Sequence, residues 1–173
     1  FKGNVPVVDD PDELPDLLRV FTQEGLAGFD TETRPNFKKG EKHKVALLQL
    51  ANDNTAVLVR LHRAGIPEVL KTFLESQNVI KIGAALQQDL TGLKNILPFV
   101  PGGFVDLQTM SDKYGIKDNS LRKLAANVIG VRISKAQRLT NWEAPLLTEQ
   151  QLLYAATDAW ISYEIYKKLI QIK

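Results

Sequence analysis

The sequence predicts an α/β fold in which helices flank a mixed β-sheet. Three apolar, strand-like stretches in the first half of the chain are separated by spacers short enough for antiparallel connections. In the second half, similar stretches alternate with helical patterns. The 173 residues hold no internal repeat and no Pro/Gly-rich linker, so we expect one domain spanning residues 1–173.

Local signals place the individual elements. A helix is predicted to start at the N-cap Asp10 and to end at Gly25, and the last helix to start at Thr148, which forms a capping box with Gln151. Apolar residues at helical spacing predict three further helices, Pro67–Ser76, Leu86–Leu97 and Leu121–Ile129. The five expected strands are Leu26–Thr31, Val45–Ala51, Thr55–Leu61, Val79–Ala84 and Phe104–Leu107.

Composition excludes several classes of protein. The chain has no cysteine, which rules out disulfides, thiolate zinc sites and cysteine nucleophiles, and it has only two histidines. No run of residues approaches the roughly 18 apolar positions of a membrane span, so we expect no membrane partner. These features are compatible with a cytoplasmic protein, or with a nuclear one if the source is eukaryotic.

Basic residues gather in two stretches although the net charge is only +2. Residues 34–44 hold five bases and one acid, and residues 113–138 hold seven bases and one acid. Either stretch could contact the phosphates of a polyanion, or be an ordinary solvated surface. The lysines of the first stretch fit either a loop that guides a nucleic-acid strand or a polar hairpin.

Acidic residues stand where burial makes a carboxylate costly. Asp30 and Glu32 are two apart at a strand end and therefore point to the same face. Asp89 flanks the apolar stripe of its helix, and Asp158 lies within the apolar stripe of the last helix, one turn after Tyr154. Taken alone, each has an ordinary explanation, namely a strand end, a boundary acid or a buried Asp–Tyr hydrogen bond.

Taken together, the four carboxylates permit a metal site, although their spacing does not require one. Oxygen ligands without histidine or cysteine favour Mg²⁺ or Mn²⁺. Two such ions would draw the acids together and promote in-line displacement at phosphorus. Tyr154 would then orient the attacking water or help to deprotonate it.

Three segments resemble the three motifs of the DEDDy 3′–5′ exonucleases, in the same order and with similar separation. They read FDTETRP (29–35), KIGAALQQDLTGL (81–93) and LYAATDAWISYEIY (153–166). Residues 134–159 are especially similar to the branch that contains ribonuclease D and the Werner-syndrome exonuclease. The resemblance extends from about Leu26 to the C-terminus.

This resemblance implies a ribonuclease-H-like fold with a five-stranded sheet and the removal of nucleoside monophosphates from a 3′ end by two-metal hydrolysis. It implies that two Mg²⁺ or Mn²⁺ ions bind to the family's four acids, and that a tyrosine assists. The matching positions are Asp30, Glu32, Asp89 and Asp158 for the acids and Tyr154 for the tyrosine.

The implied partner is a nucleic acid with a free 3′ end. Thr31 and Thr33 flank the acids where family members approach the terminal nucleotide, and Lys135 and Arg138 are expected to contact backbone phosphates. One departure from the family pattern is that Ala85 and Leu86 stand where many members have an asparagine.

Three functions remain open at this point. The missing asparagine favours DNA as the substrate, but no residue announces a contact to a 2′-hydroxyl group, so a ribonuclease D-type enzyme that trims RNA 3′ ends is an alternative. A catalytically inactive nucleic-acid-binding module is the third, and the presence of all four acids and the tyrosine argues against it.

Overall fold

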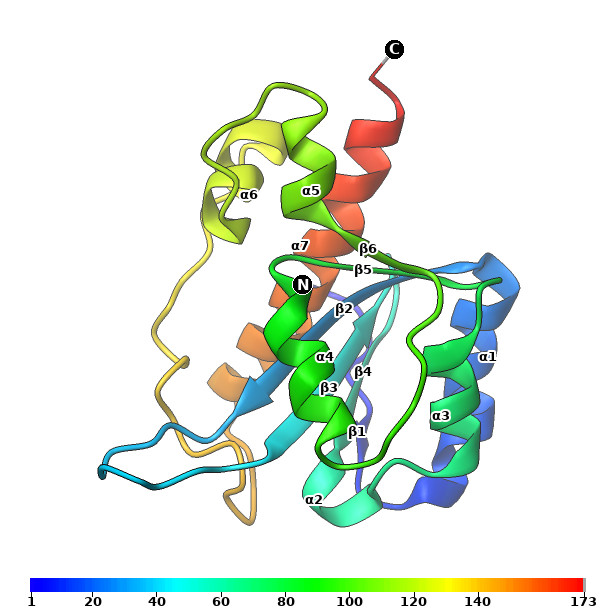
Figure 1. Cartoon of the computed structure of the whole chain (residues 1–173), viewed down its shortest axis with the longest axis vertical. Helices are drawn as coiled ribbons and strands as arrows, with labels where there is room; N and C mark the ends of the chain where they lie inside the picture. Colours follow the sequence, from blue (N-terminus) through cyan, green and yellow to red (C-terminus); the bar gives the residue numbers. More distant parts are fainter. Residues whose placement is uncertain (173) are drawn as a thin grey trace.

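The structure, a computed structural model, describes residues 1–172 and contains a six-stranded mixed sheet (Figure 1). In spatial order the strands are β1 (Val7–Val8), β4 (Ala56–Arg60), β3 (Val45–Ala51), β2 (Leu26–Thr33), β5 (Ile80–Gly83) and β6 (Phe104–Asp106). β3 runs antiparallel to both β2 and β4, and the remaining neighbours are parallel. The predicted mixed sheet is therefore confirmed.

The number of strands differs from the expected five because of β1. This strand has only two residues, Val7 and Val8, which pair in parallel with Leu58 and Val59 of β4. Two residues are too few to show a strand period, so only the pairing with β4 reveals the strand.

The five predicted helices are all present, with shifted ends. They are α1 (Leu14–Glu24), α3 (Glu68–Glu75), α4 (Leu86–Lys94), α6 (Leu121–Ile129) and α7 (Glu149–Ile170). Asp10 caps a short 3₁₀ turn, η1 (Pro11–Glu13), and α1 follows that turn directly. The predicted capping box between Thr148 and Gln151 opens α7. Among residues 1–172, no helix has both the length and the apolar character needed to cross a bilayer.

Two short helices were not predicted from the sequence. α2 (Leu61–Ala64) follows β4 directly, and α5 (Leu107–Asp112) follows β6. Leu61 and Leu107 are apolar, which made them fit the ends of the expected strands. Asp106 turns the chain into α5 because its side chain accepts a hydrogen bond from the backbone N–H of Gln108.

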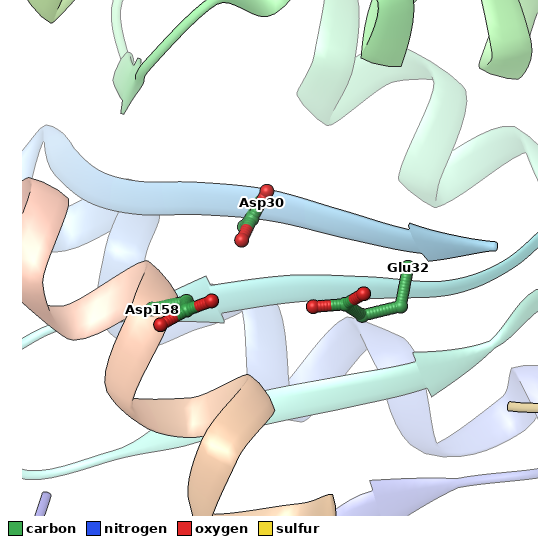
Figure 2. A group of neighbouring side chains, drawn as sticks. All are labelled: Asp30, Glu32 and Asp158. Atoms are coloured by element: carbon green, nitrogen blue, oxygen red, sulfur yellow. The ribbon is translucent and has the colours of Figure 1, made fainter. Parts of the chain in front are cut away.

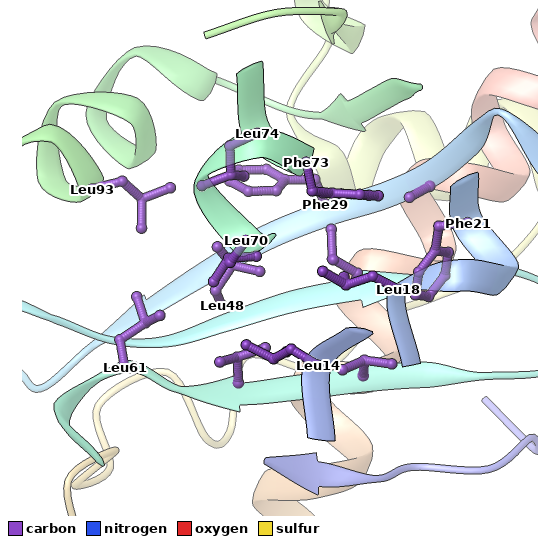
Figure 3. Close-up of a cluster of buried hydrophobic side chains, with 14 of the residues drawn as sticks. Leu14, Leu18, Phe21, Phe29, Leu48, Leu61, Leu70, Phe73, Leu74 and Leu93 are labelled. Atoms are coloured by element: carbon purple, nitrogen blue, oxygen red, sulfur yellow. The ribbon is translucent and has the colours of Figure 1, made fainter. Parts of the chain in front are cut away.

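Helices cover both faces of the sheet (Figure 1). α1 and α3 pack against each other, and the main apolar cluster fills the space between them and one face of the sheet. Figure 3 shows that leucine and phenylalanine side chains dominate this cluster. On the opposite face α7 contacts four strands, from β4 to β5. The predicted acids of β2 and α7 lie on that second face.

Candidate active site

β2 and α7 bring three carboxylates together (Figure 2). Asp30 and Glu32 project from the face of β2 that α7 covers. The helix comes very close there because Gly28 has no side chain: a Cβ at Gly28 would stand 1.9 Å from the carbonyl oxygen of Ala159. Asp158, next to Ala159, thereby reaches the acids of β2. One carboxylate oxygen from each of Asp30, Glu32 and Asp158 lies within 4.8 Å of the other two.

Burial makes this cluster costly to ionise. Glu32 and Asp158 are each only 8% exposed. Burial, followed by the charges of Asp158 and Asp89, raises the pKa of Glu32 to about 8. Burial raises the pKa of Asp158 to about 7, against the effect of a hydrogen bond with Tyr154. Burial and the neighbouring acids also hold the pKa of Asp30 well above its usual value. Three such carboxylates are stable together only when protonated or bound to a cation.

Asp89 lies beside this group rather than within it. It stands in the first turn of α4, and its carboxylate accepts a hydrogen bond from the hydroxyl of Thr31. Its charge raises the pKa values of Asp30 and Glu32, and burial raises its own pKa to about 6. The structure thus brings three of the four predicted acids into one group and places the fourth next to them.

Tyr154 lies one helical turn before Asp158 on α7. Its ring packs against the buried Trp142, with 6.0 Å between ring centroids. Burial and then the charge of Asp158 raise the pKa of the Tyr154 hydroxyl above its usual value. The side chain is therefore a neutral phenol, which is suited to orienting a water molecule rather than to removing its proton.

Glu32 and Asp89 line a cleft of about 750 Å³, and three of the four predicted substrate-contacting residues line it as well. These residues are Thr31, Thr33 and Arg138. Arg138 also lines a smaller hollow of about 190 Å³, together with Lys135 and Asp158. The positive charge of Arg138 lowers the pKa of Glu32, against the larger effects of burial and of the neighbouring acids.

Residues at the site fit a divalent cation. The three clustered ligands are carboxylates, with no histidine or cysteine among them, a donor set that hard ions such as Mg²⁺ and Mn²⁺ prefer. Gln49 adds a second indication. It is fully buried on β3, directly opposite Asp30, and its amide faces the Glu32 carboxyl, whose pKa it lowers, without forming a well-aligned hydrogen bond. A buried amide without a well-aligned partner is costly unless bound groups orient or satisfy it.

Sequence reasoning overlooked Gly28 and Gln49. Glycine inside a strand often marks a close approach of another backbone, and Gly28 stands two residues before Asp30 on the same face. Gln49 is the one polar residue in the buried run of β3, VALLQLA. Both residues are unusual within their strands, but their roles can be recognised only once α7 is seen to pack on β2.

Ala85, where the family asparagine was missing, caps α4 in a left-handed conformation with φ of 56°. Its side chain makes no capping hydrogen bond. Asp106 supplies the cap instead, because its carboxylate accepts hydrogen bonds from the backbone N–H groups of Ala85 and Leu86. The start of α4, and so the position of Asp89, depends on this contact.

A family model described as 3′-5′ exonuclease matches residues 5–172. The chain belongs to this family. It is 37% identical over 148 residues to exonuclease 3′-5′ domain-containing protein 2 of Drosophila melanogaster, covering 83% of this chain and 25% of that protein. It is 33% identical over 150 residues to the mouse bifunctional 3′-5′ exonuclease/ATP-dependent helicase WRN, covering 83% of this chain and 11% of that protein. The chain therefore spans only a part of these relatives.

Solved structures of exonucleases share the fold. Escherichia coli RNase D superposes with a TM-score of 0.87 at 24% identity, over 97% of this chain and 44% of that one. The EXO domain of Aedes aegypti Nibbler superposes with a TM-score of 0.86 at 21% identity, over 99% and 90% of the two chains. These matches confirm the predicted ribonuclease-H-like fold of this exonuclease domain.

Proposed function

We propose that this exonuclease domain removes nucleoside monophosphates from the 3′ end of a nucleic acid, using two Mg²⁺ or Mn²⁺ ions. The observation that carries the proposal is the meeting of Asp30, Glu32 and Asp158 next to a cleft that Glu32 and Asp89 line. Because all four acids and Tyr154 lie around the same place, an inactive binding module is the weaker alternative.

The four acids would hold the ions. When bound, the ions lower the pKa of an attacking water and stabilise the leaving oxygen. Tyr154, held neutral next to Asp158, orients that water by hydrogen bonding. Ionised carboxylates are required for metal binding, so bound cations reverse the upward pKa shifts of the acids.

The substrate would lie between the two walls of the cleft. Thr31 and Thr33 contact the terminal nucleotide, while Arg138 and Lys135 contact phosphates from the opposite side. The positive charge of Arg138 also offsets part of the repulsion between the acids and the phosphate.

We favour DNA as the substrate, because Ala85 and Leu86 replace the asparagine of many family members. An RNA 3′-end-trimming enzyme of the ribonuclease D type is the second candidate. It is supported by the fold shared with a Trypanosoma brucei RNase D solved with the RNA U12, which superposes with a TM-score of 0.84 at 18% identity. A nucleic-acid substrate further suggests action in the cytoplasm, or in the nucleus of a eukaryote.

Paired digestion of 3′-labelled and 5′-labelled oligonucleotides, as DNA and as RNA, tests this function. With Mg²⁺ or Mn²⁺, we expect immediate release of labelled mononucleotide from the 3′ end and a ladder of shortened 5′-labelled products. EDTA should stop both, and preference between the two sugars decides between DNA and RNA. Binding of the oligonucleotides without cleavage under any of these conditions would contradict the proposed activity.

A further inference from the structure

The loop between β2 and β3, residues 34–44, separates two hollows. The cleft of about 750 Å³ that contains Glu32 and Asp89 is lined on one side by Lys42, His43 and Lys44. The same three residues line a second hollow of about 430 Å³, which continues to His62 on α2. Lys42–Lys44 therefore forms a ridge that borders the cleft on one side and the second hollow on the other.

Acids near this ridge pair with other groups: Glu143, which lines the second hollow, pairs with Arg34. Glu41 is the only acid in the loop, and its carboxylate accepts hydrogen bonds from the backbone N–H groups of Phe37 and Lys38 and pairs with His43 at 3.3 Å. Glu41 therefore pairs with groups of its own loop and not with Lys42 or Lys44. Within residues 1–172, neither Lys42 nor Lys44 forms an ion pair. Both side chains are exposed.

An ordinary solvated lysine needs no partner, but three features distinguish this pair. It borders the cleft that holds the acids, it continues into a second hollow, and it belongs to a loop that Glu41 braces from within. Phe37, on the same loop, has an exposed aromatic ring, 76% accessible. Unpaired ammonium groups next to an exposed ring are the combination that binds single-stranded nucleic acid, through phosphates and stacked bases.

We propose that Lys42 and Lys44 form a second phosphate-binding site, which holds internucleotide phosphates of the substrate strand outside the cleft. A strand whose 3′ end reaches the acids has further phosphates beyond the cleaved bond. The ridge places two free charges where the strand can pass from the cleft toward the hollow that contains His62. This site rests on the proposed function, since it binds the same strand. If the site exists, strands long enough to reach it should bind more tightly than short ones.

Oligonucleotide binding measures the site without any cleavage. We would compare the native protein with K42S/K44S and with K38S/K39S, a control that removes two lysines from the same loop, neither of which lines a hollow. The probe is a fluorescent single-stranded octanucleotide in EDTA, titrated by anisotropy at several salt concentrations. Each phosphate contact to a single strand contributes about −0.7 to the slope of log affinity against log salt, so K42S/K44S should make this negative slope shallower by about 1.4.

The control distinguishes a local phosphate site from a diffuse effect of loop charge. K38S/K39S should keep most of the native slope, and unchanged thermal unfolding of both variants verifies that they fold. An equal loss of slope in the two variants would mean that charge acts diffusely over the loop, and the site would be overturned. A native slope in K42S/K44S would overturn it as well.

Cleavage adds a second measurement with Mn²⁺. An unphosphorylated dinucleotide has a single phosphate, the one that is cleaved, and so has none for the ridge. The ratio of kcat/KM for the octanucleotide to that for the dinucleotide should fall about tenfold in K42S/K44S, as expected for the loss of two phosphate contacts. If the native protein cleaves neither substrate, the proposed function fails, while the anisotropy experiment still decides on the ridge.

Discussion

The two faces of the central sheet both bury apolar side chains, but the face toward α7 also buries the acids of the site. The face toward α1 and α3 is filled by large apolar side chains such as Phe21, Phe29 and Leu74, all buried (Figure 3). The face toward α7 combines small residues, among them Gly28, with the acids of the site. Large apolar groups stabilise the fold, whereas buried carboxylates weaken it.

β2 shows the contrast within a single strand. Phe29 points to the apolar face and packs edge-on against Phe104, with ring centroids 5.1 Å apart. Its neighbour Asp30 points to α7 and has a pKa raised well above its usual value by burial. The alternation of a strand thus lets one segment serve stability with one set of residues and metal binding with the other.

The largest expected effect is on the α7 face. We expect D158N to lower kcat/KM at least about a thousand-fold, roughly 4 kcal/mol of transition-state stabilisation, because it removes a metal ligand. Without metal, the same substitution should raise the free energy of unfolding, since it removes a buried and repelled carboxylate. Kinetics with Mn²⁺ and urea unfolding in EDTA measure the two effects. Near-native activity would contradict the assignment of Asp158 as a ligand.

A matched change on the apolar face should act in the opposite way. Phe29 is 1% exposed, so F29A is expected to lower the free energy of unfolding by about 3–5 kcal/mol. Its activity, corrected for the folded fraction, should fall far less than that of D158N. Urea unfolding and kinetics at low temperature test this, and a large loss of intrinsic activity would show that the two faces are not separable.

The next effect is the dependence of stability on pH, which we expect to come from the acids on the α7 face. The pKa values of Glu32 (about 8), Asp158 (about 7) and Asp89 (about 6) are raised in the folded state, so the folded protein binds more protons than the unfolded chain between their ordinary values near 4 and these values. Stability in EDTA should therefore fall as the pH rises from about 4 to 8.

Metal should reverse this pH dependence. Mn²⁺ competes with protons for the carboxylates, so its stabilising effect should grow over the same range of pH. Urea unfolding at pH 5 and pH 8, with EDTA and with Mn²⁺, gives the four values needed. Stability in EDTA that rises toward pH 8 would show that the acids are not buried and crowded as described.

Gln49 allows a finer test on the α7 face. Q49M keeps the length of the side chain but removes its amide, so we expect Mn²⁺ to bind about tenfold more weakly, as for the loss of a group that supports metal ligands. Stability without metal should change little, because the buried amide that is removed makes no well-aligned hydrogen bond. Calorimetric titration with Mn²⁺ measures the affinity.

A matched control is L47M, which alters the neighbouring buried position on the same face of β3 without changing any polar group. It should bind Mn²⁺ like the native protein. Equal weakening in Q49M and L47M would assign the effect to packing under α7 rather than to the amide.

The smallest expected effect is at the start of α4. Because Ala85 has a φ of 56°, A85G should raise the free energy of unfolding by about 1 kcal/mol through relief of the left-handed strain. The hydrogen bond from the backbone N–H of residue 85 to Asp106 is kept, so activity should change little. A destabilised A85G variant would mean that the conformation of Ala85 is not strained.

The sequence by itself determined the strands β2 to β6, the five longer helices and the identity of the acids. Strand alternation, helical spacing and caps such as Thr148 with Gln151 involve residues only a few positions apart, so each can be recognised locally. The family motifs added which acids belong together. Their use as ligands and the substrate contacts of Lys135 and Arg138 stay predictions.

Only the tertiary structure decided how the acids meet. The close contact of Gly28 with Ala159, which brings Asp158 to β2, joins residues more than a hundred positions apart. The link between Thr31 and Asp89 and the position of the buried Gln49 amide beside Glu32 likewise arise from packing between distant segments. No local pattern encodes such contacts, because they depend on how closely the backbones of separate elements can approach each other.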